Sequence, residues 1–330
     1  MNQDQHDGPA ATPGIGRREL LRRAGLAGAV AAATTVSPLS ASAAASNRDS
    51  WRNPGRGGRY LVPRSRIAMG MVTYSFATSP PSPIYSVLDE IRDIGYRGVE
   101  LFELRGFTGG ITRAQEVKQL LADANLHGVG NMHYYGFGGS DWGNSLDRFI
   151  AEDKAAGMEH MAFVAHRTTP ETQTEAYYKE LAAKFNVWGA AVKRAGMKFT
   201  VHNEQWVFDR DPVTGKLLYD VWIEETDPEL VFFTIDTAWF SFRGIDLIKY
   251  VRRLDKDDRI TQFHIKEYDG SANVTPSPPV GSGVIDWKKL FLTIKDPEKY
   301  WYILESERQT DPKASAMQAY DFLATLKTSS

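Results

Sequence analysis

The sequence predicts a single (β/α)8 TIM barrel, an α/β fold in which eight parallel strands alternate with helices. Two patterns predict it. Short apolar segments of strand length recur along the chain, and a segment with helical periodicity follows each of them. The strand segments are almost continuously apolar, which is typical of parallel strands covered by helices. The number of units and their combined length match one barrel.

The units follow one another in a regular order. Strands are expected at residues 67–76, 97–104, 127–135, 158–166, 197–204, 230–240, 260–268 and 299–307. Helices are expected at residues 82–96, 112–126, 145–157, 174–196, 217–229, 244–257, 284–296 and 313–326. Strand and helix therefore alternate eight times, as the barrel requires.

An open, doubly wound sheet is the alternative fold. Its nucleotide-binding form has a glycine fingerprint directly after the first strand. Residues 71–83 read MVTYSFATSPPSP instead, and the glycine string GFGGS at 136–140 comes only after the third strand. The barrel is therefore favoured.

The first 43 residues differ in composition from the rest and resemble a twin-arginine export signal. Arg17 and Arg18 precede a short apolar run at residues 24–36, and ASA at 41–43 is a candidate cleavage site. The run is shorter than the about 20 residues that a membrane-spanning helix needs. We expect a periplasmic or extracellular protein without a stable membrane anchor after cleavage, with a disordered Ala-rich tail as the alternative. Residues 44–65 then form a flexible tether, and residues 66–327 form the barrel.

Charge and cysteine content exclude several classes of function. The net charge is −2, whereas nucleic-acid binding normally needs a clustered basic excess, so no nucleic-acid partner is expected. Cysteine is absent, which excludes disulfides, thiolate catalysis and zinc–cysteine sites. Any metal must be held by histidine, carboxylate or carbonyl groups. The sequence is compatible with a homo-oligomer but does not define the oligomeric state.

Polar residues end four successive strands of the predicted barrel: Glu204 in VHNE, Asp236 in FFTID, His264 in TQFHI and Glu305 in YWYILE. Active sites of such barrels lie at the carboxyl ends of the strands, so these groups are expected to meet at one rim. Crowded carboxylates repel one another unless a cation lies between them. One divalent metal ion, Mn²⁺, Mg²⁺, Co²⁺ or Zn²⁺, is therefore the expected cofactor.

The ordered elements VHNE, IDTAWF, FHIKEYDG, PVGSGVIDW and YILESER resemble the xylose isomerase-like TIM-barrel superfamily, in particular its sugar phosphate isomerase/epimerase-like proteins. The resemblance covers about residues 66–327. It implies a single divalent ion held by a carboxylate from strand five, an Asp from strand six, a His from strand seven and a Glu from strand eight. Asp236, His264 and Glu305 match the last three positions.

Strand five departs from the family pattern. Many relatives read His-Asn-His followed by an aromatic-Glu-Phe, whereas here the third position is Glu204 and Val207 replaces the later Glu. Other relatives have the ligand Glu where His202 stands. His202 and Glu204 share the barrel-facing side because side chains alternate along a strand. Either can reach the ion, and Glu204 is favoured as the ligand.

Other polar groups have both a functional and a plain structural reading. Lys266 faces the same side as His264 and can steady an oxyanion, or form a salt bridge at the rim with Glu307 or Glu103. Asp236 can cap a helix, His264 can be an ordinary core histidine, and Glu305 can pair with Arg308.

Further residues near the strand ends are candidate substrate contacts. The aromatic faces among them can stack on the C–H faces of a sugar. The candidates are His133, His166, Trp206, Trp239, Glu103 and Arg308. Glu103 is preferred to Glu100 on strand two because it lies nearer the carboxyl end, and the aromatic residues can equally belong to the core.

Together these features predict a metal-dependent sugar isomerase or epimerase. Glu204 and Glu305 form the candidate proton-transfer pair, with His202 and Lys266 as further catalytic candidates, and they act on the C–H beside a carbonyl through an enediolate. The same chemistry on a 3-keto-glycoside gives a lyase or hydratase, and a non-catalytic sugar-binding barrel is a further alternative. Apurinic endonucleases share the barrel but need a multi-zinc cluster and a basic face, which this chain does not offer. The partner is thus a small sugar or glycoside.

Overall fold

The computed structural model describes residues 58–75, 84–104, 111–135, 142–165 and 169–328. The proposed export signal, most of the tether and His166 lie outside these ranges. Within them, no helix combines the length and the apolar character needed to cross a bilayer.

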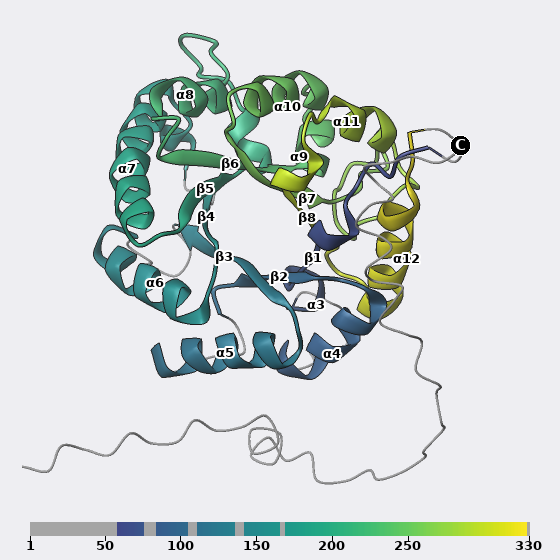
Figure 1. The fold of residues 1–330 in the computed structure, drawn as a ribbon. Coiled ribbons are helices and arrows are strands. Elements are labelled where there is room, and N and C mark those ends of the chain that lie inside the picture. The colour runs from purple at the N-terminus through teal and green to yellow at the C-terminus, as the bar shows by residue number, and fades with distance from the viewer. Residues whose placement is uncertain (1–57, 76–83, 105–110, 136–141, 166–168, 329–330) are drawn as a thin grey trace, which may run out of the picture. The chain divides into compact units, whose positions relative to one another are not determined.

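Eight parallel strands form a closed barrel, which confirms the predicted fold (Figure 1). Each strand pairs with its neighbours in the chain, and β1 closes the ring on β8. The strands are β1 (Ile67–Gly70), β2 (Gly98–Phe102), β3 (His127–Tyr135), β4 (His160–Ala165), β5 (Lys198–His202), β6 (Val231–Asp236), β7 (Ile260–Ile265) and β8 (Trp301–Leu304).

Helices surround the ring of strands, as Figure 1 shows. They are α3 (Val72–Ser75), α4 (Ile84–Ile94), α5 (Ile111–Asp123), α6 (Trp142–Ala156), α7 (Glu175–Arg194), α8 (Leu218–Glu225), α9 (Thr237–Phe242), α10 (Leu247–Lys256), α11 (Trp287–Thr293) and α12 (Pro312–Thr325). Short 3-10 turns lie at η1 (Arg64–Arg66), η2 (Pro170–Thr172), η3 (Gln205–Phe208) and η4 (Pro297–Lys299). The main apolar core lies between the strands and these helices.

In two of the predicted strand segments the apolar run continues into a helix. The run at 67–76 continues past Gly70, but residues 72–75 form α3. The run at 230–240 ends as a strand at Asp236, whose side chain accepts hydrogen bonds from Ala238 and Trp239 and starts α9. Apolar composition alone does not separate a buried strand from a buried helical turn.

Apolar side chains close the amino-terminal end of the barrel interior. Ala68 from β1, Val129 from β3 and Trp301 and Ile303 from β8 form one buried cluster. β3 is not a neighbour of β1 or β8 in the ring, so these contacts must cross the interior. The indole N–H of Trp301 donates to Glu159 at 2.9 Å. The interior at this level is packed, not open.

The long connection between β7 and α11 is held in place by hydrogen bonds to one buried carboxylate. Glu267 accepts hydrogen bonds from the backbone N–H groups of Tyr268 and Gly281, at 2.9 and 2.8 Å, and from the Trp287 indole at 2.6 Å. Its oxygens therefore fix both ends of the loop beside the carboxyl ends of the strands.

Candidate active site

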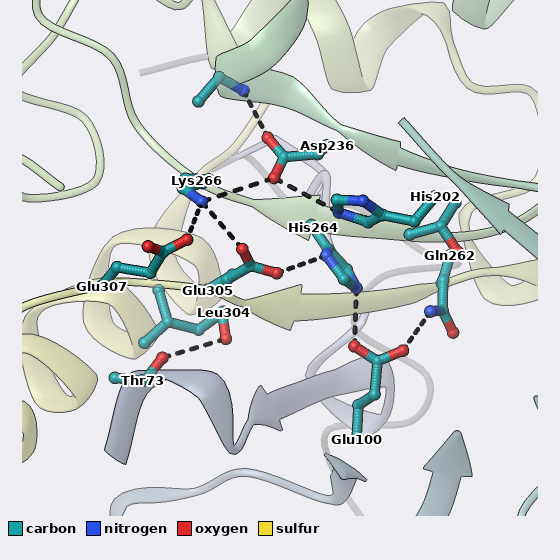
Figure 2. Close-up of polar contacts among 12 residues, drawn as sticks. Thr73, Glu100, His202, Asp236, Gln262, His264, Lys266, Leu304, Glu305 and Glu307 are labelled. Atoms are coloured by element: carbon teal, nitrogen blue, oxygen red, sulfur yellow. Dashed lines mark hydrogen bonds and ion pairs between the residues drawn. The ribbon is translucent and has the colours of Figure 1, made fainter. Parts of the chain in front are cut away.

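Four buried side chains converge at the carboxyl ends of β5 to β8 (Figure 2). His202 ends β5, Asp236 ends β6, His264 lies near the end of β7, and Glu305 directly follows β8. Each offers one ligand atom, and these atoms all lie within 4.8 Å of one another. We call these four residues the metal cluster. It contains three of the four residues that the sequence assigned to a cation site, with His202 in place of Glu204.

The donor set of the metal cluster fits a divalent cation. Both ring nitrogens of His202 and Oδ2 of Asp236 are buried and have no hydrogen-bond partner in the described part of the chain. Each unpaired buried group of this kind costs about 1–3 kcal/mol. Two imidazoles and two carboxylates are ligands that Zn²⁺, Mn²⁺ and Co²⁺ accept, whereas Mg²⁺ prefers oxygen alone.

Asp236 has two separate roles, one for each oxygen. Oδ1 accepts the N–H groups of Ala238 at 2.9 Å and Trp239 at 3.4 Å, and so caps α9. Oδ2 faces the metal cluster, 3.6 Å from Nε2 of His202 and 3.9 Å from the ammonium of Lys266. The helix-cap reading of Asp236 is therefore compatible with a ligand role.

His264 lies between two carboxylates. Its Nδ1 is 2.6 Å from Glu305 Oε2, and its Nε2 is 2.7 Å from Glu100 Oε2. Burial is the largest single influence and disfavours the charged imidazole, but the two carboxylates together outweigh it and raise the pKa of His264 well above its usual value. The imidazole therefore carries a proton readily in this negative environment.

Lys266 is fully buried and forms ion pairs with two glutamates. Its Nζ lies 2.9 Å from Oε1 of Glu305 and also contacts Glu307 (Figure 2). It also lies 4.9 Å from the ring centroid of Trp239, a cation–π contact. Burial opposes the charge, but the carboxylates raise the pKa of Lys266 well above its usual value. The predicted pairing with Glu307 is confirmed, and the Glu305 contact brings the ammonium to the metal cluster.

Glu204 and Glu305 are shifted in opposite directions. Burial raises the pKa of Glu204 well above its usual value; Lys266 opposes this shift and Asp236 adds to it. For Glu305, burial also favours the neutral acid, but Lys266 and His264 outweigh it and hold its pKa well below its usual value. Glu204 is thus the more basic carboxylate, and Glu305 remains ionised.

Glu204 lies next to the metal cluster. It follows β5, makes no helix-cap hydrogen bond at the start of η3, and places Oε1 4.0 Å from Nδ1 of His202. The four-membered ligand group includes His202 instead. The geometry therefore favours the reading of strand five in which the imidazole is the ligand.

The candidate substrate contacts lie in different surroundings. Trp206 is half-buried in η3, and Trp239 lies under Lys266. Glu103 is exposed after β2, where it accepts the backbone N–H of Tyr134 at 3.3 Å, and Arg308 is exposed after β8. Their contacts with a substrate stay predictions.

His133 lies on the outer side of the barrel, which corrects the expectation that it reaches the rim. Its Nε2 is 2.8 Å from Asp153 on α6, and its ring packs 4.3 Å from the ring of Phe149. Because side chains alternate along β3, the same face carries Asn131, which also contacts Asp153 at 2.7 Å. His133 is thus part of the packing between β3 and α6.

The sequence analysis did not place Glu100 or Gln262 at the site. Glu100 and Gln262 are buried inside the barrel, below His264 (Figure 2). The available signal was a charged residue in the middle of the apolar run GVELF, since a buried carboxylate needs a partner. Glu103 was preferred to Glu100 because it lies nearer the carboxyl end of the strand.

Comparisons with known proteins agree with the barrel fold. A family model described as xylose isomerase-like TIM barrel matches residues 88–326. Inosose dehydratase from Mesomycoplasma hyopneumoniae (strain 7448) is 24% identical over 277 residues, which cover 72% of this chain and 87% of that protein.

Two crystal structures show the same fold. The 3-keto-D-glucoside 4-epimerase YcjR from E. coli matches with a TM-score of 0.59 at 17% identity, over 79% of this chain and 99% of that chain. The IolI protein with a bound zinc atom matches with a TM-score of 0.59 at 11% identity, over 78% of this chain and 96% of that chain.

Proposed function

The chain belongs to the xylose isomerase-like TIM barrel family, and we propose that it is a divalent-metal-dependent enzyme that moves a proton beside the carbonyl group of a sugar or glycoside. The observation that carries this proposal is the metal cluster of His202, Asp236, His264 and Glu305, buried next to Glu204 and Lys266. The zinc atom in the IolI structure supports a metal, whereas the identity of the ion here is part of the proposal.

When bound, the divalent ion supplies a Lewis acid that polarises the substrate carbonyl. Glu204 takes the proton from the adjacent carbon, because it lies beside the metal cluster and burial makes its ionised form a stronger base than an exposed carboxylate. The ammonium of Lys266 donates a hydrogen bond to the oxygen on which negative charge develops. Glu305 stays ionised and serves as a ligand.

The fate of the proton decides the reaction. If Glu204 returns it to the neighbouring carbon, the product is the isomeric aldose or ketose. If a second group protonates the original carbon from the other face, the product is the epimer. Glu305 was the expected second group, but its lowered pKa makes it a poor proton donor. Lys266 is the alternative donor in this proposal, because its ammonium lies 2.9 Å from Glu305 at the metal cluster.

A β-elimination is the second candidate reaction. The same enolate can expel a leaving group from the next carbon, which gives a dehydratase or a lyase acting on a 3-keto-glycoside. The relative named inosose dehydratase supports elimination, and the structure named 3-keto-D-glucoside 4-epimerase supports epimerisation. A non-catalytic sugar-binding barrel would bind the ion without either reaction.

The test is a screen of free ketoses and 3-keto-glycosides in deuterated water, with Zn²⁺, Mn²⁺ or Co²⁺ added to chelator-treated protein. Deuterium at the carbon beside the carbonyl, with the skeleton intact, indicates an isomerase or epimerase. An absorbing enone or a released alcohol indicates elimination. Metal binding without exchange into any keto sugar would contradict the proposal.

A further inference from the structure

A carboxylate inside the barrel contacts the metal cluster from below. Glu100 lies in the middle of β2 and is almost completely buried. Its Oε2 is 2.7 Å from Nε2 of His264 on β7 (Figure 2). β8 and β1 separate these strands in the ring, so the contact crosses the barrel interior. The interior of such barrels is usually filled by branched apolar side chains. A carboxylate buried there is costly unless polar or charged partners compensate for the lost water.

A second contact fixes the other oxygen of Glu100. The amide nitrogen of Gln262 donates to Glu100 Oε1, and the amide oxygen of Gln262 lies 2.9 Å from Nδ1 of His160 on β4. With His160 donating to the amide oxygen, the amide N–H points to Glu100, which must then accept. This chain of directed hydrogen bonds fixes the orientation of the Glu100 side chain.

The neighbouring strand leaves room for this group. A Cβ at Gly130 would lie 3.4 Å from Oε1 of Glu100 and 3.2 Å from the backbone oxygen of His160. A larger residue at position 130 would therefore press on the carboxylate and on β4. The glycine lets Glu100 extend towards β7.

The contact determines which nitrogen of His264 is available to a ligand. A carboxylate at Nε2 favours the tautomer with the proton on Nε2, which leaves the lone pair of Nδ1 facing Glu305 and the other members of the metal cluster. In the structure Oε2 of Glu100 and Nε2 of His264 form an ion pair without a hydrogen bond, so the contact is electrostatic.

We propose that Glu100 is a positioning residue that holds the Nε2 proton of His264 and presents Nδ1 to the divalent ion, with Gln262 and His160 fixing the carboxylate. This inference rests on the proposed metal-dependent function. It assigns Glu100 no contact with substrate. Partners of this kind typically change metal affinity by about 10–100-fold when they are removed.

The test compares Glu100→Gln with Asp153→Asn in the full chain. The control removes the charge from another buried His–carboxylate pair, His133–Asp153, which lies outside the metal cluster. Zn²⁺ and Mn²⁺ affinities are measured by competition with a chelator of known affinity. Glu100→Gln should bind about 10–100-fold more weakly, and Asp153→Asn should bind like the wild type.

Nitrogen NMR of the histidine side chains reports which ring nitrogen of His264 carries the proton, and a general loss of stability would not change this assignment. In the Zn²⁺-bound wild type, His264 should show a protonated Nε2 and a metal-bound Nδ1, and Glu100→Gln should lose this fixed assignment. Gln262→Met, which removes only the lower anchor, should give a smaller loss of affinity, and it tests the same proposal if Glu100→Gln does not fold.

Unchanged affinity and an unchanged His264 tautomer in the variants would overturn this inference alone. Failure of the wild type to bind any of these ions would overturn the proposed function together with it. The two failures are therefore distinguishable.

Discussion

At the scale of single residues, strand five poses the sharpest question. His202 supplies a buried ring within the metal cluster, and Glu204 lies beside that ring with a raised pKa. The sequence favoured Glu204 as the ligand because the resemblance implies a carboxylate at this strand. The geometry favours the imidazole as the ligand, and under the proposed function Glu204 then carries the proton.

We therefore predict opposite phenotypes for two substitutions. His202→Asn should lose the divalent ion, because it removes one of four ligands. Glu204→Gln should keep the ion but lower the rate of C–H exchange by about 10²–10⁴-fold, since it removes a positioned acid–base group. Metal content by mass spectrometry and deuterium exchange by NMR check both. A Glu204→Gln protein that loses its ion while His202→Asn keeps it would restore the original assignment.

Lys266 gives a prediction about stability. Lys266→Met leaves the buried carboxylate of Glu305 without its ammonium partner, and breaking such a buried pair typically costs about 3–5 kcal/mol. Urea unfolding in the presence of a chelator measures this loss.

The control for this measurement is Lys179→Met. Lys179, which is exposed, pairs with the partly buried Glu175 on α7 at 2.8 Å, and pairs of this kind near the surface contribute little to stability. Equal losses of unfolding free energy in the two variants would show that burial does not increase the contribution of the Lys266 ion pair to stability.

At the scale of elements, α7 contains a glycine that packing requires. Gly189 lies in the interior of the helix, where Ala would gain about 1 kcal/mol in helix propensity. A Cβ there would approach the backbone oxygen of Leu230 to 2.4 Å. Gly189→Ala should therefore lower the free energy of unfolding by about 1–3 kcal/mol, because the steric term exceeds the propensity term.

Val187→Ala provides the comparison for α7. Val187 is 67% exposed on the same helix, so Ala there changes propensity with little packing and should stabilise slightly. Thermal unfolding of the two variants separates the terms. A stabilised Gly189→Ala protein would mean that the loop before β6 moves away without penalty.

The element scale also shows where sequence reading stops. Apolar runs placed all eight strands, but the runs through Val72 and Ala238 continued into helical turns. The break at β6 depends on one oxygen of Asp236 binding two backbone N–H groups. The sequence offered Asp236 as a helix cap, but the apolar residues after it were still assigned to the strand.

At the scale of the whole molecule, the parts of the site that sequence could predict are those that topology fixes. Residues at the ends of consecutive parallel strands must meet at one rim, and this placed Asp236, His264 and Glu305 together. Contacts across the interior, such as Glu100 with His264, depend on the size of the ring and on strand register. His133 was misplaced because the face of a strand cannot be read without the register of its neighbours.

The whole chain also includes the proposed export signal. We propose that Arg17 and Arg18 direct the folded protein to the twin-arginine route. Replacing both with Lys should retain active protein in the cytoplasm, and fractionation followed by an activity or metal-binding assay would measure it. Undiminished export of the double variant would remove the basis for a periplasmic or extracellular location.

The packed amino-terminal end of the barrel has a consequence for molecular traffic. Ala68, Val129, Trp301 and Ile303 pack together in the interior at that level, so among the described residues apolar side chains lie beneath the metal cluster. If the proposed function is right, we expect reactant and product to enter and leave at the carboxyl ends of the strands. A departing product therefore blocks the arriving reactant, and accumulated product should act as a competitive inhibitor whose dwell time limits how fast the next molecule enters.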